Sequence, residues 1–252
     1  MTEPRRAAAE WTDWGAHVRI VVTDPDRLDA ASSMLRGVVA AADAATNLER
    51  PDAEVHTLGD EPRSVGPLLA QFVADAVHVA ERTAGAVAPH PRWREIVVDG
   101  TTVRAPSDLD LTATGRPSTA DLAARQIADL LDCGVLIAIG GHVRAVGSGG
   151  RDGWQVLVRD MPGEPSSQIA LPAGGGVATA STLTPLHDDP AAPRPQWRTV
   201  SVVAPTCVDA HALATAALRR RGGAIDWLAQ KGAPARLVDQ EMRVITLAGW
   251  PG

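Results

Sequence analysis

The stretch LDLTATGRPSTADLAARQIADLLDCGVLIAIGGHVRAVG, residues 109–147, decides the fold that this sequence predicts. It begins with a strand-like apolar start and passes through a polar turn at residues 110–116. An amphipathic segment follows, for which we expect a helix over residues 119–132 with Ser118 as its N-cap. Gly134 then stops the helix. The stretch therefore predicts a turn, a helix and a strand in direct succession.

An apolar strand buried on both faces is expected at residues 135–139. Gly140-Gly141-His142 should end this strand, and residues 143–146 should continue the chain beyond it. Elsewhere, apolar residues at helical spacing predict helices at 28–46, 66–83, 209–221 and 225–232. Alternating patterns predict strands at 16–23, 154–159, 167–171, 177–180, 199–204, 235–238 and 242–247, and a hairpin about Asp99-Gly100.

Helices fall between strands in this order, but hairpin-like neighbours are also common. That combination favours an α+β fold with mixed, largely antiparallel sheets and packed helices over a doubly wound parallel fold. The chain has 252 residues, of which 45% are hydrophobic and 21% are charged. We expect one domain spanning residues 1–252, with ample length for a core.

The net charge of −6 gives no general basic field for nucleic acid. No uninterrupted apolar run approaches the roughly 20 residues that a membrane helix needs, so membrane insertion is not expected. The N-terminal residues hold no apolar signal core, and we expect a cytoplasmic location.

Four local patterns are candidates for chemistry, each with an ordinary structural alternative. Glycines at 147–150 resemble a phosphate loop, but a strand follows them instead of a helix, which favours a hairpin loop. The turn at 110–121 can present backbone amides and Arg116 to a phosphate, or be a surface turn with an ion pair.

His211 and Thr215 share one helix face at positions i and i+4. Both can reach one cation, although such a pair is more often structural. His187-Asp188-Asp189 can supply an acid, a base or metal ligands, or be a solvated loop. None of these patterns decides the function by itself.

Motifs also follow one another in order along almost the whole chain. They are Trp14-Gly15, ADAATNLERPDAEVHTL (42–58), TAGAVAP (83–89), LDLTATGRPSTADLAA (109–124), IGGHVRAVG (139–147), GWQVLVRD (153–160), GVATAST (176–182), DPAAPRP (189–195) and VSVVAPTCVDAHALATAAL (200–218). Taken together they resemble the FAD:protein FMN transferase (ApbE) family. Residues 109–121 are similar to the family signature Leu-Asp-Leu-Gly-x-x-x-Lys-x-x-x-x-Asp, and the resemblance depends on the ordered set of nine motifs.

The resemblance implies an ApbE-like fold that binds FAD and a divalent cation, Mg²⁺ being expected and a transition metal possible. A threonine of a target flavoprotein would attack the FMN phosphorus, AMP would leave, and the metal would neutralise the pyrophosphate. By position, the metal ligands would be the Ala113 carbonyl, His211 and Thr215. The residues in contact with the flavin nucleotide would be Trp14, Asp110, Arg116, His187 and Asp189.

The sequence departs from the family pattern at several of these positions. Arg116 stands where the family has lysine, and Pro117 replaces a small residue. His142 and His211 stand where the family has acidic residues, and imidazole favours transition metals over Mg²⁺. We therefore expect reduced or metal-shifted activity. Two alternatives remain open: a non-catalytic member that binds flavin or a partner protein, and an FAD pyrophosphatase in which water is the attacking group.

Overall fold

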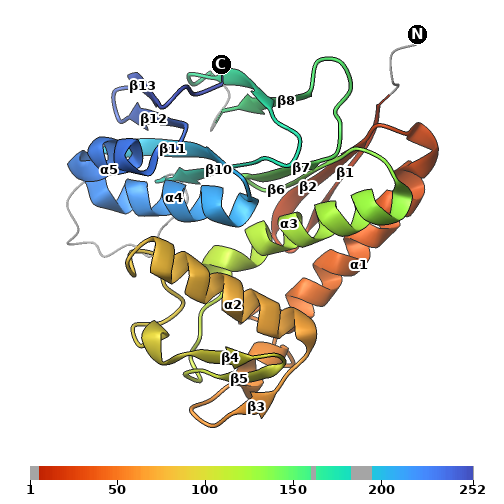
Figure 1. Cartoon of the computed structure of the whole chain (residues 1–252), viewed down its shortest axis with the longest axis vertical. Coiled ribbons are helices and arrows are strands. Elements are labelled where there is room, and N and C mark those ends of the chain that lie inside the picture. Colours follow the sequence, from red (N-terminus) through yellow and green to blue (C-terminus); the bar gives the residue numbers. More distant parts are fainter. Residues whose placement is uncertain (1–5, 160–162, 183–194, 252) are drawn as a thin grey trace.

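A computed structural model describes residues 6–159, 163–182 and 195–251. Its largest element is an eight-stranded sheet in the order β1-β2-β6-β7-β10-β11-β12-β13, and every pairing is antiparallel (Figure 1). The strands are β1 (Ala7–Asp13), β2 (Ala16–Val22), β6 (Val135–Ile139), β7 (His142–Val146), β10 (Gly176–Ser181), β11 (Trp197–Ala204), β12 (Ala235–Asp239) and β13 (Val244–Leu247). The predicted α+β class with largely antiparallel sheets is confirmed.

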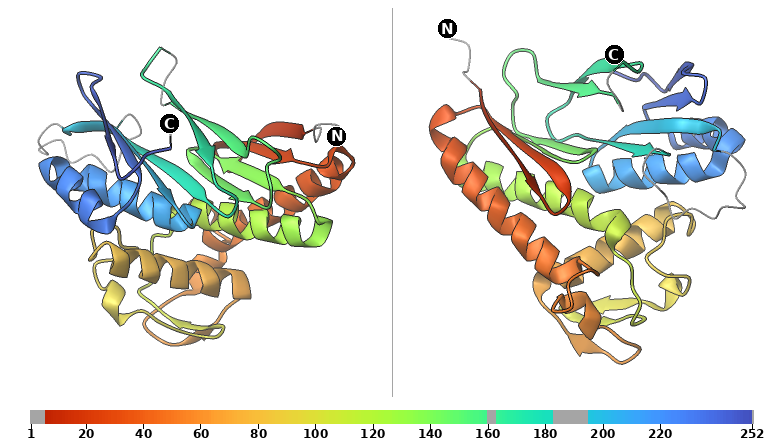
Figure 2. Two further views of the ribbon diagram at one scale, coloured as in Figure 1. Left: turned by 45° about the horizontal axis from the view of Figure 1, so that its top comes forward. Right: turned by 180° about the vertical axis from the view of Figure 1, so that it is seen from behind.

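Helices cover one face of this sheet (Figure 2). α1 (Leu28–Thr46) and α3 (Thr112–Leu131) pack on β2 and β6, and α4 (Cys207–Arg220) and α5 (Ala224–Lys231) pack on β10, β11 and β12. Alternate residues of each strand point to this layer, since successive side chains in a strand face opposite sides. Val18, Ile20 and Val22 are accordingly buried against the helices.

The opposite face of the sheet carries the hairpin of β8 (Trp154–Val158) and β9 (Ser167–Leu171). Trp154, Leu171 and the C-terminal Trp250 are buried there against the strands. The hairpin rises from the sheet on the side away from the helices (Figure 2). The central strands are thus covered on both faces, by the helices on one face and by the β8–β9 hairpin on the other.

A third layer lies below the helices in Figure 1. It contains α2 (Pro67–Arg82) and a small antiparallel sheet of β3 (Arg63–Ser64), β5 (Thr102–Arg104) and β4 (Val97–Asp99). Phe72, Leu69 and Val103 are completely buried in the core of this layer. The chain leaves this core at Leu111 and enters α3, which joins the lower layer to the main sheet.

The structure differs from the local predictions at three places. The helix in the opening stretch begins at Thr112, and Ser118 lies inside it as a buried residue whose hydroxyl has no partner among the described residues. Pro117 lies in the second turn of that helix and does not end it, because proline lacks only one donor there and packing holds the helix on both sides.

At Gly140-Gly141 the chain reverses, since Ile139 pairs with His142 in an antiparallel hairpin. The positive φ of Gly140, +59°, suits this tight turn. Strand β1 was not predicted, and in the structure its side chains alternate between partly buried and exposed.

Candidate functional site

A pocket of about 640 Å³ opens where the helix layer, the sheet and the β8–β9 hairpin meet. Its walls come from α3, α4, β8, β10 and the turns that precede β2 and β7. The polar and charged side chains on these walls are His17, Arg116, His142, Arg159, Thr179, Ser181, His211 and Thr215. Ligand pockets typically have this size and combine apolar walls with a few polar groups, so this is the candidate site.

Two histidines and a threonine form one hydrogen-bonded chain on the wall. His142 Nδ1–H donates to the Ile139 carbonyl at 3.0 Å, which leaves His142 Nε2 as an acceptor for His211 Nδ1–H, also at 3.0 Å. His211 Nε2 then accepts from the Thr215 hydroxyl at 3.3 Å. Each imidazole has one donor and one acceptor in this arrangement, so both rings are satisfied in the neutral form.

Burial lowers the pKa of His142 from 6.5 to about 4, with the charge of Arg116 acting in the same direction. Burial and the neighbouring His142 hold the pKa of His211 well below its usual range. Both imidazoles are therefore neutral at pH 7, and they are weak bases.

Acid should destabilise the protein through His142. The unfolded chain binds a proton at this side chain near pH 6.5, whereas the folded chain binds it only near pH 4. Between these values the unfolded state holds more protons, so the free energy of unfolding falls as the pH falls, by about 2–3 kcal/mol from His142. Urea unfolding at pH 7 and pH 4.5 measures this loss.

The variant His142→Gln should lose less stability over that range, while His17→Gln, altered on the exposed side of the same wall, should behave like the wild type. Equal acid sensitivity of wild type and His142→Gln would contradict the lowered pKa of His142.

Arg116 is held beside Trp14 at the pocket. Its Nη2 donates to the Trp14 carbonyl at 2.8 Å, and its guanidinium lies 5.9 Å from the centre of the Trp14 ring. A guanidinium has five N–H donors, and the others have no acceptor among the described residues. Arg116 is therefore fixed in place with donors left for an anionic ligand.

Trp14 and Gly15 form the two-residue turn between β1 and β2. Trp14 has a φ of +45°, an unusual conformation for a large side chain that costs about 1 kcal/mol. Its ring packs on α3, where a Cβ at Gly115 would meet it at 3.0 Å. Only glycine lets the ring approach this closely, and such local strain is typical of functional sites.

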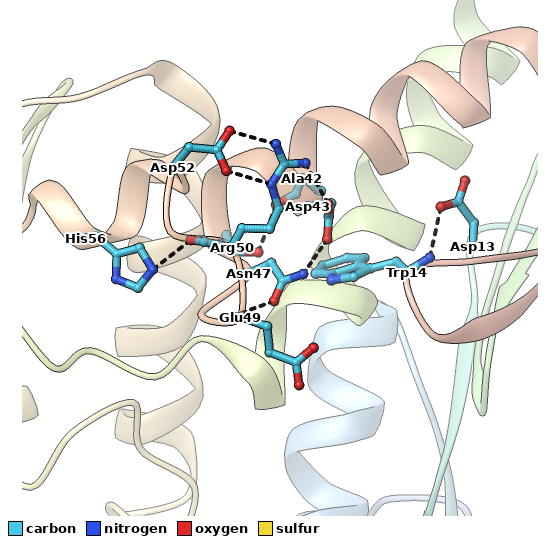
Figure 3. A network of polar contacts seen from close by, with 10 residues as sticks. Asp13, Trp14, Ala42, Asp43, Asn47, Glu49, Arg50, Asp52 and His56 are labelled. Carbon is cyan, nitrogen blue, oxygen red and sulfur yellow. Dashed lines mark hydrogen bonds and ion pairs between the residues drawn. The ribbon is translucent and has the colours of Figure 1, made fainter.

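An ion-paired turn after α1 lies close to Trp14 (Figure 3). Asp43 accepts from Asn47 at 2.7 Å and from Arg50 at 2.9 Å, and Arg50 also holds both oxygens of Asp52. The hydrogen bonds to Asp52 and Asp43 raise the pKa of Arg50. This network fixes the polar loop that follows α1, for which the sequence predicted no regular structure.

The predicted site residues fall into three groups. Arg116, His211 and Thr215 line the large pocket, with Trp14 in contact with Arg116. Asp110 and Ala113 line a separate small pocket between α2 and α3. His187 and Asp189 lie outside the described residues.

Ala113 lies beside α4, in one apolar cluster with Val208, Ala212 and Ala216. Four residues later Pro117 has no N–H, so it cannot donate to the Ala113 carbonyl as a regular helix requires. The backbone thus frees this oxygen for another partner. Pro117, which stands where the family has a small residue, is the sequence feature that indicates this free carbonyl oxygen.

Asp121 and Arg144 were not predicted as partners. Both are buried, and Arg144 Nε lies 3.2 Å from Asp121 Oδ1. Asp121 also accepts from the backbone amides of Cys207 and Val208, at 2.9 and 3.0 Å, and so caps the N-terminus of α4. Burial raises the pKa of Asp121, while these amides and Arg144 oppose that shift. The carboxylate therefore positions the helix that carries His211.

Arg159 is a further pocket residue that the sequence did not indicate, as are His17, Thr179 and Ser181. It follows β8 at the pocket wall and is exposed. A single arginine at the end of an alternating strand carries no sequence signal for binding. Only the placement of the β8–β9 hairpin over the sheet brings it to the pocket.

The fold and the pocket define a class of α+β protein in which an antiparallel sheet, its helix layer and a hairpin enclose a polar ligand site. The ApbE family model matches residues 86–237, more than half of the chain, and the chain belongs to the ApbE family. No curated protein sequence matches this chain significantly.

Solved structures share the whole fold. The flavinyl transferase ApbE of Pseudomonas stutzeri, in its apo form, has a TM-score of 0.80 at 14% identity, covering 98% of this chain and 97% of that one. The ApbE protein of Thermotoga maritima has a TM-score of 0.80 at 19% identity, covering 96% and 97%. The flavin transferase ApbE of Vibrio cholerae has a TM-score of 0.76 at 14% identity, covering 98% of each. At such identities the likeness establishes the fold.

No helix in the described ranges has the length and apolar character needed to cross a bilayer.

Proposed function

We propose that this protein transfers FMN from FAD to a threonine of a target flavoprotein. The observation that carries the proposal is Arg116, held against Trp14 at the pocket with unused donors. A guanidinium binds phosphate oxygens in pairs, so Arg116 is suited to orient the FAD diphosphate. Membership of the ApbE family supports the same reaction class. We also propose that residues 1–252 act as a single domain, since the structural likeness spans up to 98% of the chain.

In the proposed reaction the threonine oxygen forms a bond to the FMN phosphorus, and the bond from that phosphorus to the bridging oxygen breaks. AMP leaves with the bridging oxygen, and the threonine proton passes to water. The pocket histidines are poor proton acceptors because their pKa values are lowered. Positioning and charge neutralisation then supply most of the rate.

The divalent metal that the resemblance implies does not fit the donors present. The Ala113 carbonyl and the Thr215 hydroxyl suit Mg²⁺, but His211 offers an imidazole that already accepts from Thr215. No group of three or more His, Cys, Asp or Glu that is able to hold a metal occurs among the described residues. We therefore derive no step through a metal, and we propose that activity with Mg²⁺ is weak.

The test combines purified protein, FAD and a target domain that carries an acceptor threonine, with EDTA, Mg²⁺, Mn²⁺ or Zn²⁺. Covalent flavin on the target and AMP in solution, in equal amounts, support the proposal. Neither product under any condition would overturn it. AMP and free FMN in the absence of the target would indicate the pyrophosphatase reaction, in which water is the nucleophile.

A carboxylate at position 211 should create the missing Mg²⁺ ligand. In His211→Asp, Mg²⁺ should raise the rate of AMP release by about tenfold or more relative to EDTA, because a carboxylate oxygen is a ligand that Mg²⁺ prefers. His17→Asp is the matched control, since it adds the same charge elsewhere on the pocket wall. If His211→Asp keeps the metal response of the wild type, position 211 is not a ligand position.

The paired imidazoles favour a second candidate, a family member that binds flavin or a partner protein without catalysis. His142 and His211 are hydrogen-bonded to each other. They stand at the two positions where the family has acidic residues, so no carboxylate is present at either position. Titration with FAD, followed by flavin fluorescence, distinguishes the candidates. Saturable binding without AMP release supports the non-catalytic member.

A further inference from the structure

The charges on the pocket wall are of one sign. Arg116 and Arg159 are its cationic side chains, and the three histidines on the wall are His17, His142 and His211. Among the described residues that line the pocket, none is aspartate or glutamate. A divalent cation requires anionic oxygen ligands, and two guanidiniums repel it. The described wall is thus built for an anion.

The two arginines reach the pocket from different layers of the fold. Arg116 comes from α3 in the helix layer and is anchored through the Trp14 carbonyl. Arg159 follows β8, on the hairpin that covers the other face of the sheet. Both arginines line the same pocket, so a ligand there is within reach of a guanidinium from each layer.

We infer that Arg116 and Arg159 neutralise the diphosphate of FAD without a divalent metal. The inference rests on the proposed function, because it takes FAD as the ligand. A dinucleotide diphosphate carries two negative charges, and two guanidiniums match them with hydrogen bonds as well as charge. The hydrogen-bonded His142–His211 pair belongs to the same arrangement, since it stands where the family has acidic residues and so leaves out the carboxylates that a metal needs.

The test measures FAD affinity by flavin fluorescence in EDTA and in Mg²⁺. The dissociation constant should agree within about twofold between the two conditions. Arg159→Ala should weaken FAD binding by about tenfold, the usual effect of losing one charged hydrogen-bond donor. Arg151→Ala, altered at an exposed arginine in the loop before β8 and outside the pocket lining, should bind like the wild type.

Riboflavin provides a ligand control, because it has the same ring system and no phosphate. Its binding should not change in Arg159→Ala, whereas a merely structural role of Arg159 would weaken both ligands. An affinity for FAD that rises tenfold or more with Mg²⁺ would overturn the inference. Wild-type affinity of Arg159→Ala for FAD would also overturn the inference.

The result also separates this inference from the proposed transfer reaction. Metal-free binding of FAD without AMP release upholds the inference and overturns the reaction. Metal-dependent binding of FAD with AMP release overturns the inference and leaves the proposed reaction standing. Absence of FAD binding in every condition overturns both.

Discussion

Asp121→Ala is expected to lower the free energy of unfolding by about 3–5 kcal/mol, the usual cost of removing one partner from a buried ion pair. The substitution leaves the buried guanidinium of Arg144 without its carboxylate. It also removes the acceptor of the Cys207 and Val208 amides at the start of α4. In a chain of this size the midpoint of thermal unfolding should fall by about 10 °C.

Urea unfolding at pH 7 measures the change. Asp129→Ala is the matched control, because Asp129 is exposed on the same helix. The loss of unfolding free energy in Asp121→Asn should lie between those of Asp121→Ala and Asp129→Ala, since an amide oxygen still accepts one hydrogen bond but carries no charge. A loss in Asp121→Ala no larger than that of the control would show that the buried pair does not position α4.

Arg116→Ala is expected to weaken FAD binding by about 10- to 100-fold, because hydrogen bonds to a charged group contribute about 1.5–3 kcal/mol. Arg116→Lys should recover part of the affinity, since an ammonium keeps the charge but loses the paired geometry. Fluorescence titration with FAD measures both. The loss of FAD affinity should be larger in Arg116→Ala than in Arg159→Ala, because Arg116 is held in place by the Trp14 carbonyl.

Arg125→Ala, at an exposed position of the same helix, is the matched control for this prediction. Thermal unfolding distinguishes binding from folding: a lower midpoint with unchanged FAD affinity would mean that Arg116 only secures the Trp14 turn. Wild-type affinity in Arg116→Ala would remove the observation on which the proposed function depends.

Local patterns in the sequence determined most of the secondary structure. The helix predicted over residues 28–46 has those bounds in the structure, because its apolar residues repeat at the helical period and pack on one side. The hairpin about Asp99-Gly100 and the strands after residue 150 were also predicted within a few residues. The family motifs correctly indicated the fold, since their order along the chain follows the order of the elements.

The errors have a common physical cause. Ser118 was predicted as an N-cap because Asp121 follows three residues later, as in a capping box, yet α3 begins at Thr112 and continues through Pro117. In that first turn Ala113 packs with Val79 of α2 and Val208 of α4, and no local pattern encodes these contacts. Strand β1 was missed for the same reason: only its pairing with β2 makes it a strand.

For the site, the sequence by itself determined the types of side chain: an arginine, and a histidine and a threonine one helical turn apart. It placed Arg116 in a turn before the helix, whereas Arg116 lies inside α3. The tertiary structure decided which of them meet. It placed His142 against His211 from a hairpin and a helix 69 positions apart, and it joined Asp121 to Arg144 and to the amides of α4. It also brought Arg159 to the pocket that Arg116 lines. Contacts between distant segments depend on how sheets and helices pack, and a linear pattern records only the spacing within each element.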